Sequence, residues 1–368
     1  MAKVTIREIA SKLGISVATV SRAINPDTLH LVNESTRRRV ARLVKSERYV
    51  PDTAAKRLVT GKSRNIVIFF RPHVASLFFD DYYSKMIAGA MAGVERTQYN
   101  LNLSIIKEER GGFDVADAIR GLDVAGAIIA TVLGVFDIST KSIFGVPIPV
   151  IVLNQYKTGP NPGCFMVDNT KSAYDATAYL LSRGHRRIGF VRGSQAVKDA
   201  QDRYAGYRKA IADSRIAPDT DLEFQSNFLE ESGRRAVRHY FSGRFEPPSA
   251  IFFSNDAVAM TAVNDLRQIG VPCPEEVSVI GFDGIDAGRY TDPPLTTMLQ
   301  PVYEMAREAV TQLIRNIEDG GRFGGSRYFI AKLIERGTVA SYRGNRKGDA
   351  HVHGEGEADT EGAVGRRA

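Results

Sequence analysis

The sequence predicts an α/β protein with a small helical head at its N-terminus and a larger, two-lobed body of parallel sheets. Charge distinguishes the head, because residues 1–64 carry fourteen Lys and Arg against five Asp and Glu, whereas the rest of the 368-residue chain carries 35 basic and 37 acidic residues. Pattern distinguishes the body, because apolar runs alternate with stretches of helical periodicity from Asn65 onward. Such alternation is typical of parallel sheets that helices cover on both faces.

The composition excludes several classes of protein. Apolar residues make up 43% and charged residues 25% of the chain, the balance of a globular protein, and the length predicts two or three domains. The chain has no secretory signal pattern and no stretch of about twenty apolar residues that would span a membrane. Its two cysteines are too few for a disulfide framework or a cysteine metal cluster. We therefore expect a cytoplasmic protein without membrane contact, whose basic head binds a polyanion.

The head is predicted to contain three short helices. Thr5 and Glu8 have the spacing of a capping box, which begins the first helix, and Gly14 ends it. Ser16 is a good N-cap for a second helix that ends near residue 25, and Asn33 caps a third. Two short helices joined by a tight glycine turn and braced by a third helix form a helix-turn-helix unit.

The exposed face of the second helix has the side chains that DNA recognition requires. Arg22 can bind guanine, Asn25 can bind a base edge or a phosphate, and two small apolar side chains can touch thymine methyl groups. Hydroxyl groups can bind phosphates, which position the protein without reading sequence. A helical bundle with a merely polar surface is the alternative, but the basic excess independently favours DNA. The residues predicted to contact DNA are Thr5, Ser16, Val17, Ala18, Thr19, Ser21, Arg22 and Asn25.

The body is predicted to divide into two halves at the turn-rich segment 158–163. Its apolar runs predict strands at 66–70, 101–106, 126–130, 150–153, 187–191, 250–254, 277–282 and 328–333. Helices are expected near 83–98, 116–121, 170–183, 203–212, 231–241, 257–269 and 302–317. These strands are too many for one comfortable sheet, so two sheets are predicted.

Polar residues at the ends of these strands predict a ligand site. Ligands of open α/β sheets bind at the carboxyl ends of the strands, so a cleft between two such lobes is the expected site. Asp283 follows the strand at 277–282 and suits hydroxyl or amine groups, although it would equally hold a turn. Asn255 follows another strand, Asp256 fits the cap of the next helix, and Arg203 begins a helix after a loop.

The head resembles a known family of DNA-binding proteins. Residues 5–10 (TIREIA) and 14–25 (GISVATVSRAIN) closely resemble the signature of the lactose/galactose-repressor (LacI/GalR) family. The similarity continues through 49–52 (YVPD) and 54–63 (AAKRLVTGKS), and onward to about Val339.

The resemblance implies a hinge helix at 51–64 that orders on operator DNA as a pair in a homodimer. Leu58 would wedge into the minor groove with Ala55 beside it, where the cost of unstacking is offset by the contacts of bent DNA. On sequence alone, Leu58 would equally be a linker residue that packs on the body.

The resemblance also implies a body similar to periplasmic sugar-binding proteins and assigns effector contacts to it. Arg203, Asn255 and Asp283 stand at the family's contact positions, and Gln300 lies near them. Phe228 falls near an aromatic residue that stacks on the ligand. Tyr82 and Tyr83 stand where the family has two aromatic residues, although the Asn-Pro pair that usually precedes them is missing. Phe228 would otherwise be a core residue.

These expectations define the domains. They are a helix-turn-helix domain at 1–50, a hinge and linker at 51–64, an effector-binding and dimerisation domain at 65–343 and a disordered tail at 344–368. The first lobe is expected at about 65–160 and 300–322, and the second at about 163–292 and 323–340. Residues 293–297 are interpreted as a crossover between the lobes.

The predicted function is sequence-specific regulation of transcription. We expect an allosteric repressor that binds a pseudo-palindromic operator and responds to a small effector, a sugar or sugar derivative, between the lobes. One alternative is an effector-dependent activator, or a corepressor-type regulator that responds to a nucleobase; another is a solute-binding protein without DNA function. Phosphate-loop, zinc-helix and nucleophile-elbow motifs are absent from the sequence. We therefore predict no catalytic residue, cofactor or metal.

Overall fold

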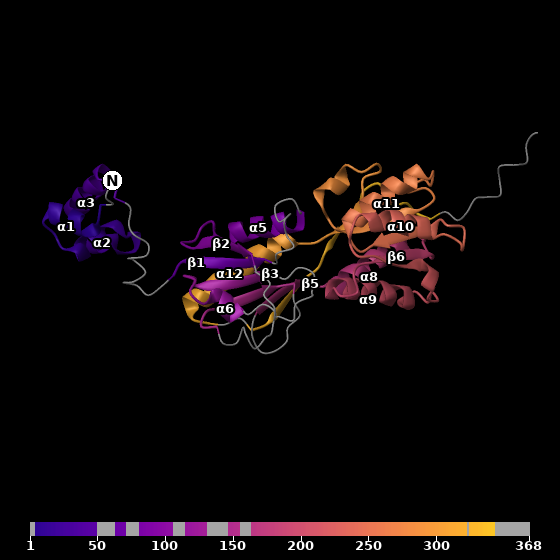
Figure 1. The fold of residues 1–368 in the computed structure, drawn as a ribbon, viewed down its shortest axis with the longest axis horizontal. Helices are drawn as coiled ribbons and strands as arrows, with labels where there is room; N and C mark the ends of the chain where they lie inside the picture. The colour runs from indigo at the N-terminus through magenta and orange to yellow at the C-terminus, as the bar shows by residue number, and fades with distance from the viewer. Residues whose placement is uncertain are drawn as a thin grey trace, which may run out of the picture. The chain divides into compact units, whose positions relative to one another are not determined.

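The computed structural model describes residues 4–49, 63–70, 81–105, 115–130, 146–154, 163–321 and 324–342 (Figure 1). The chain divides into two compact units, Met1–Arg64 and Asn65–Ala368, and each is described by itself. The predicted hinge contacts Ala55 and Leu58, the turn-rich segment 158–162 and the tail 344–368 lie outside the described residues.

The head folds as the predicted helices. They are α1 (Ile6–Leu13), α2 (Val17–Ile24) and α3 (Glu34–Ser46), with a 3-10 turn η1 (Pro26–Leu31) before α3. The Thr5 side chain accepts from the Glu8 backbone at 3.3 Å and the Glu8 carboxylate accepts from the Thr5 backbone at 2.8 Å, which completes the capping box. Gly14 ends α1 in the left-handed region at φ 65°. Ile9, Val20 and Val40 are buried where the three helices meet.

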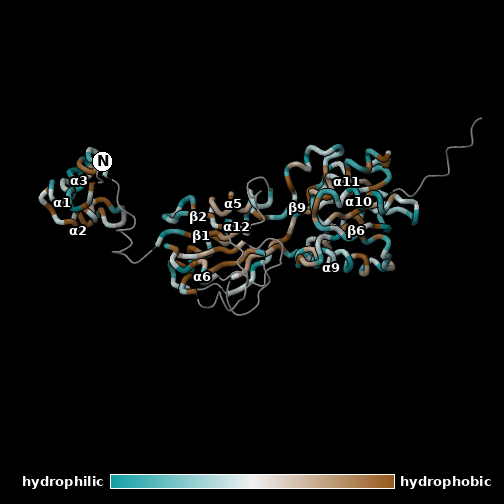
Figure 2. Tube along the Cα trace, in the orientation of Figure 1, coloured by the Kyte–Doolittle hydropathy of each residue, from teal (hydrophilic) through white to brown (hydrophobic). Residues whose placement is uncertain are grey.

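The first lobe of the body is a six-stranded sheet in the order β11-β5-β4-β3-β1-β2, and all its pairings are parallel. Its strands are β1 (Asn65–Phe70), β2 (Asn100–Ile105), β3 (Gly126–Ala130), β4 (Val150–Leu153), β5 (Gly163–Val167) and β11 (Ser326–Phe329). Helices α5 (Asp81–Val94) and α12 (Val302–Asp319) cover one face, and α6 (Val115–Ile119) packs on the other. Because β3, β5 and residues 66–70 of β1 are buried on both faces, they are apolar (Figure 2).

The second lobe is a six-stranded sheet in the order β12-β10-β9-β8-β6-β7, parallel except for β12. Its strands are β6 (Ile188–Arg192), β7 (Glu223–Gln225), β8 (Ala250–Phe253), β9 (Ser278–Asp283), β10 (Thr296–Leu299) and β12 (Lys332–Ile334). Helices α8 (Asn169–Ser182) and α9 (Lys198–Asp213) cover one face, and α10 (Glu231–Tyr240) and α11 (Asp256–Gln268) cover the other. Two 3-10 turns complete it, η2 (Thr220–Leu222) and η3 (Asp286–Arg289).

The predicted boundaries of the lobes were wrong at three strands. Residues 163–167 and 326–329 form β5 and β11 of the first sheet, although both were assigned to the second lobe. Residues 296–299 are β10 of the second sheet, so the segment interpreted as a crossover leads into a strand. The described chain instead passes between the sheets after β5, after β10 and after β11. The predicted strand at 328–333 therefore contains parts of two strands in different lobes.

Candidate functional site

The predicted recognition face of the head is the outer side of α2. Val20 and Ala23 are buried against α1 and α3, whereas Ser21 and Arg22 are exposed and the Val17 side chain is 41% exposed. The predicted DNA contacts Thr5, Ser16 and Ala18 are also exposed, and Thr19 and Asn25 are partly buried. Most of the predicted DNA contacts are therefore exposed to solvent on the three-helix head.

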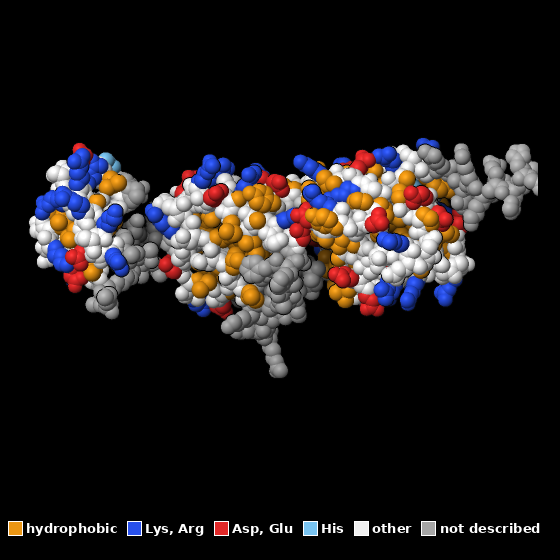
Figure 3. All heavy atoms as spheres, turned by 90° about the horizontal axis from the view of Figure 1, so that it is seen from above, with side chains coloured by type: hydrophobic (Ala, Val, Ile, Leu, Met, Phe, Trp, Pro, Cys, Tyr) orange, Lys and Arg blue, Asp and Glu red, His pale blue; other side chains and the backbone are white. Residues whose placement is uncertain are grey.

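Some polar groups of this set hold the helices in place. The Ser16 hydroxyl accepts from the Thr19 backbone at 3.1 Å and lies 2.9 Å from the Thr19 hydroxyl, so Ser16 caps α2. Arg39 of α3 donates to the Leu13 carbonyl at 3.0 Å and supports the end of α1. On the face of the head seen in Figure 3, basic side chains are more widespread than acidic ones, which suits a polyanion.

A cavity of about 610 Å³ lies in the body at the carboxyl ends of the strands. Tyr82 and Asn154 of the first lobe line it together with Arg203, Asn255 and Asp283 of the second. The structure thus brings together all seven predicted effector contacts in one cavity: Tyr82, Tyr83, Arg203, Phe228, Asn255, Asp283 and Gln300.

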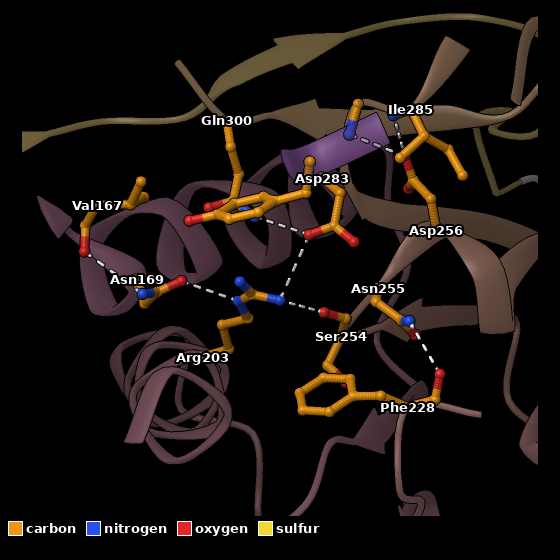
Figure 4. Close-up of polar contacts among 12 residues, drawn as sticks. Val167, Asn169, Arg203, Phe228, Ser254, Asn255, Asp256, Asp283, Ile285 and Gln300 are labelled. Atoms are coloured by element: carbon orange, nitrogen blue, oxygen red, sulfur yellow. Dashed lines mark hydrogen bonds and ion pairs between the residues drawn. The ribbon is translucent and has the colours of Figure 1, made fainter. Parts of the chain in front are cut away.

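Arg203 is the centre of the polar network in this cavity (Figure 4). Its Nε donates to Asn169 Oδ1 at 2.8 Å and its Nη1 donates to the Ser254 carbonyl at 2.5 Å. The guanidinium group also lies 3.9 Å from the centre of the Phe282 ring and 3.7 Å from Asp283 Oδ1. Because these partners come from α8, β9 and the residue that follows β8, Arg203 ties three parts of the second lobe together.

Asp283 is the carboxylate that faces Arg203. Gln300 Nε2 donates to Asp283 Oδ1 at 2.7 Å (Figure 4). Burial raises the pKa of Asp283 to about 7, although the Arg203 charge and the Gln300 hydrogen bond act in the opposite direction. Its carboxyl group can therefore gain or lose a proton near neutral pH, and the ionised form accepts hydrogen bonds from hydroxyl or amine groups.

Asp256 is a structural residue, and its expected role as a helix cap is wrong. Asn255 occupies the N-cap position of α11, without a side-chain capping bond. The Asp256 carboxylate accepts from the backbone of Gly284 at 2.8 Å and of Ile285 at 2.9 Å, and from the Thr297 hydroxyl at 2.6 Å. Asp256 therefore holds the turn that follows Asp283 and keeps that carboxylate at the cavity.

Asn255 and Phe228 form the wall beside this pair. Asn255 Nδ2 donates to the Phe228 carbonyl at 3.3 Å (Figure 4). Asn255 Oδ1 is buried and has no hydrogen-bond partner within the described part of the chain. A buried acceptor without a donor is costly, so this atom is suited to a ligand donor.

The two tyrosines differ in position. Tyr82 shares a hydrogen bond with Asn154, and burial raises the pKa of its hydroxyl group. Tyr83 is buried in the core of the first lobe, and its ring packs edge-on against Phe70 at 6.1 Å. Tyr83 therefore mainly supports Tyr82, whose ring lies 5.9 Å away.

Sequence reasoning missed several polar residues of the site, and three of them show why. Asn154 follows the predicted strand at 150–153, so the argument that selected Asn255 would have found it. Asp199 lines the cavity from the first turn of α9, which begins five residues earlier than predicted. Asn169 contacts Arg203 from α8, and no local sequence signal indicates that contact.

Comparison with known proteins gives two family models. Residues 5–52 match the model of bacterial regulatory proteins of the lacI family, and residues 177–339 match a periplasmic-binding-protein-like domain. The chain is 30% identical over 346 residues to the HTH-type transcriptional repressor CytR of Escherichia coli K12, covering 91% of this chain and 96% of that protein. It is 25% identical to the ribose operon repressor of Haemophilus influenzae, covering 86% and 92%.

A solved structure gives the same architecture. The crystal structure of the Lac repressor dimer bound to operator and the anti-inducer ONPF aligns with 92% of this chain and all of that chain, with a TM-score of 0.78 at 20% identity. At this identity the likeness shows the fold, which is the predicted one.

The fold and the two sites define a DNA-binding transcriptional regulator with a ligand-binding body. The chain belongs to the LacI family of bacterial regulatory proteins. This family consists of transcriptional regulators and not of enzymes. Among the described residues no group of His, Cys, Asp and Glu could hold a metal ion, and no helix could cross a membrane. The alternative of a solute-binding protein without DNA function is disfavoured by the match at residues 5–52.

Proposed function

We propose that this protein is a cytoplasmic homodimeric repressor whose affinity for a pseudo-palindromic operator is set by a small polar effector. The observation that carries the proposal is the cavity lined by both lobes, with the Arg203–Asp283 pair on one side and Tyr82 with Asn154 on the other. A ligand that contacts both lobes binds one arrangement of them more tightly than another. Such differential affinity is what effector control of DNA binding requires.

The DNA contacts follow from a two-fold dimer. Two identical recognition helices would read two half-sites, so the operator would be pseudo-palindromic. The exposed face of α2 would enter the major groove, with Arg22 on guanine. Leu58, with Ala55 beside it, would widen the minor groove at the operator centre.

The effector is proposed to be a sugar or sugar derivative. Its hydroxyl groups would donate to Asp283 and Asn255 and accept from Arg203, and the rings of Tyr82 and Phe228 would lie against its apolar face. The name of the ribose operon repressor, a relative, supports this class.

A pair of substitutions tests both halves of the proposal. We expect R22A to weaken binding to an operator selected from random DNA at least about fivefold, because a bidentate arginine–guanine contact is worth about 1–3 kcal/mol, while effector binding stays unchanged. We expect D283A to bind the operator normally and to lose the response to effector, because Arg203 and Gln300 then lack their partner. Fluorescence anisotropy on labelled operator, with and without effector, measures both.

Each variant serves as the control for the other. An R22A protein that still discriminates the selected operator from random DNA would contradict the assigned recognition face. A D283A protein that still responds fully to effector would contradict the assigned cavity. An effector that tightens operator binding in the wild type would make the protein a corepressor-type regulator.

A further inference from the structure

The charges that line the cavity are strongly unbalanced. Its described lining contains five carboxylates and one cationic side chain: Asp81, Asp199, Glu230, Asp283, Asp286 and Arg203. Carboxylates only accept hydrogen bonds when they are ionised. The cavity therefore offers many acceptors and few donors to a ligand.

The cationic groups near the cavity are already engaged. Arg203 uses its Nε and Nη1 on Asn169 and Ser254, and Asp283 lies within ion-pair distance of it. Lys85 pairs with Asp81 at 2.6 Å and also donates to the Gly284 carbonyl at 2.9 Å. Lys198, which precedes Asp199, pairs with Asp202. Each of these three cations thus already lies within hydrogen-bond or ion-pair distance of a carboxylate, so none is an uncompensated charge that would anchor a phosphate or a carboxylate.

Asp199 removes the remaining place at which an anion would bind. It occupies the first turn of α9, a sixteen-residue helix whose N-terminus faces the cavity lining. A helix N-terminus attracts anions through its free N–H groups and its dipole, but a carboxylate in the first turn already satisfies that preference.

The Asp199 carboxylate is also available to a ligand. It is partly buried, and no hydrogen bond or ion pair joins it to another residue within the described ranges. Burial raises its pKa, and the charges of Arg203 and Lys198 only partly oppose this effect. The Asp199 carboxylate and the unpartnered Asn255 Oδ1 are therefore two acceptors in the cavity that a ligand donor can satisfy.

We propose that the cavity selects its effector by charge: it binds a donor-rich molecule that is uncharged or carries an amine, it rejects phosphorylated and acidic molecules, and Asp199 is the residue that determines this specificity. This inference rests on the proposed function, since it takes the cavity to be the effector site. An anionic ligand would lie among carboxylates without a free cation, whereas hydroxyl or ammonium groups would satisfy Asp199 and Asn255. Rejection by like charge is a recognised means of specificity.

Matched probe pairs on the full-length protein test the inference. Thermal shift and isothermal titration calorimetry would compare ribose with ribose 5-phosphate, glucose with glucose 6-phosphate, and adenosine with adenosine monophosphate, with glucosamine as the amine probe. We expect binding only by uncharged or amine probes, with each phosphorylated counterpart at least tenfold weaker. D199N should lower the affinity for the uncharged or amine probe at least fivefold. It should also reduce the ratio of that affinity to the affinity for the phosphorylated counterpart.

D213N is the matched control. Asp213 lies at the other end of α9, is exposed and pairs with Lys209, so its substitution makes the same change in net charge away from the cavity. D213N should bind all probes like the wild type. A phosphorylated probe that binds as tightly as its parent, or a D199N protein with unchanged affinities, would overturn the inference while leaving the proposed function intact. If no probe of either charge bound, the proposed function itself would fall, and the inference with it.

Discussion

At the residue scale, the cavity is marked by unusual backbone. Among the described residues other than glycine, five have positive φ, and three of these line the cavity: Asn154 at 57°, Phe228 at 67° and Asp283 at 128°. Such conformations cost free energy and persist only where the surroundings hold them, which is common at binding sites. Asp256 supplies part of that restraint, because it binds the two backbone N–H groups that follow Asp283.

The raised pKa of Asp283 predicts a pH dependence of stability. Because its folded pKa of about 7 lies above the ordinary value of 3.8, the folded protein keeps a proton that the unfolded chain has already lost. Its contribution to stability is therefore complete below about pH 4 and is lost as the pH rises to about 7. Asn in place of Asp283 does not titrate. We expect the free energy of unfolding of the wild type to fall relative to D283N between pH 4.5 and 7.5.

Urea unfolding of both proteins at several pH values measures this difference. We expect it to be on the order of 1 kcal/mol or more, since one pKa unit corresponds to about 1.36 kcal/mol. Asp283 is 21% exposed, and Arg203, Gln300 and Asp256 all act on it. If the wild type instead gained stability over D283N with rising pH, the attraction of Arg203 would exceed the cost of burial.

At the scale of elements, the sequence predicts the helices of the head and most strands of the body, but it misses β5, β7 and β10. The helices of the head have local start and stop signals, such as the Thr5–Glu8 capping box, and their bounds were close to those observed. Strand β7 has only three residues, and β5 directly follows the turn-rich segment 158–163, so neither has a clear local pattern. Such strands are stabilised by their neighbours in the sheet more than by local preference.

The packing of α8 against α9 predicts a site that does not tolerate a side chain. A Cβ atom on Gly206 of α9 would lie 2.2 Å from the Thr170 carbonyl and 2.9 Å from the Tyr174 backbone nitrogen of α8. Since backbone atoms cannot move aside alone, G206A would force the helices apart. We expect a loss of about 1–3 kcal/mol in the free energy of unfolding, the usual cost of overpacking, measured by urea denaturation.

Gly321 provides the matched control for this substitution. A Cβ atom there would have no neighbour within 4 Å, so G321A should change the free energy of unfolding by about 0.5 kcal/mol or less. Equal stability of G206A and G321A would mean that α8 and α9 separate without cost.

At the scale of the whole molecule, the assignment of strands to lobes depends on crossings that no local pattern shows. The chain leaves the first sheet after β5, returns through α12 and leaves it again after β11. The residues of the cavity are likewise brought together by these crossings. Sequence reasoning found Asp283 and Asn255 from their places at strand ends, but it missed the contact of Asn169 with Arg203, which depends on tertiary packing.

A hydrogen bond between the lobes predicts how the cavity is coupled to their arrangement. Lys85 of α5, in the first lobe, donates to the carbonyl of Gly284, which follows Asp283 in the second lobe. K85M would remove this bond and make the arrangement seen here less populated, which lowers the apparent effector affinity by the same factor. A hydrogen bond to a charged group is worth about 1.5–3 kcal/mol, but Lys85 is 26% exposed and solvent reduces that value. We therefore expect the effector affinity of K85M, measured by calorimetry, to fall about fivefold.

The control is K332M, at an exposed lysine of β12, which should leave the effector affinity unchanged. If K85M bound as tightly as the wild type, this bond would not stabilise the binding-competent arrangement.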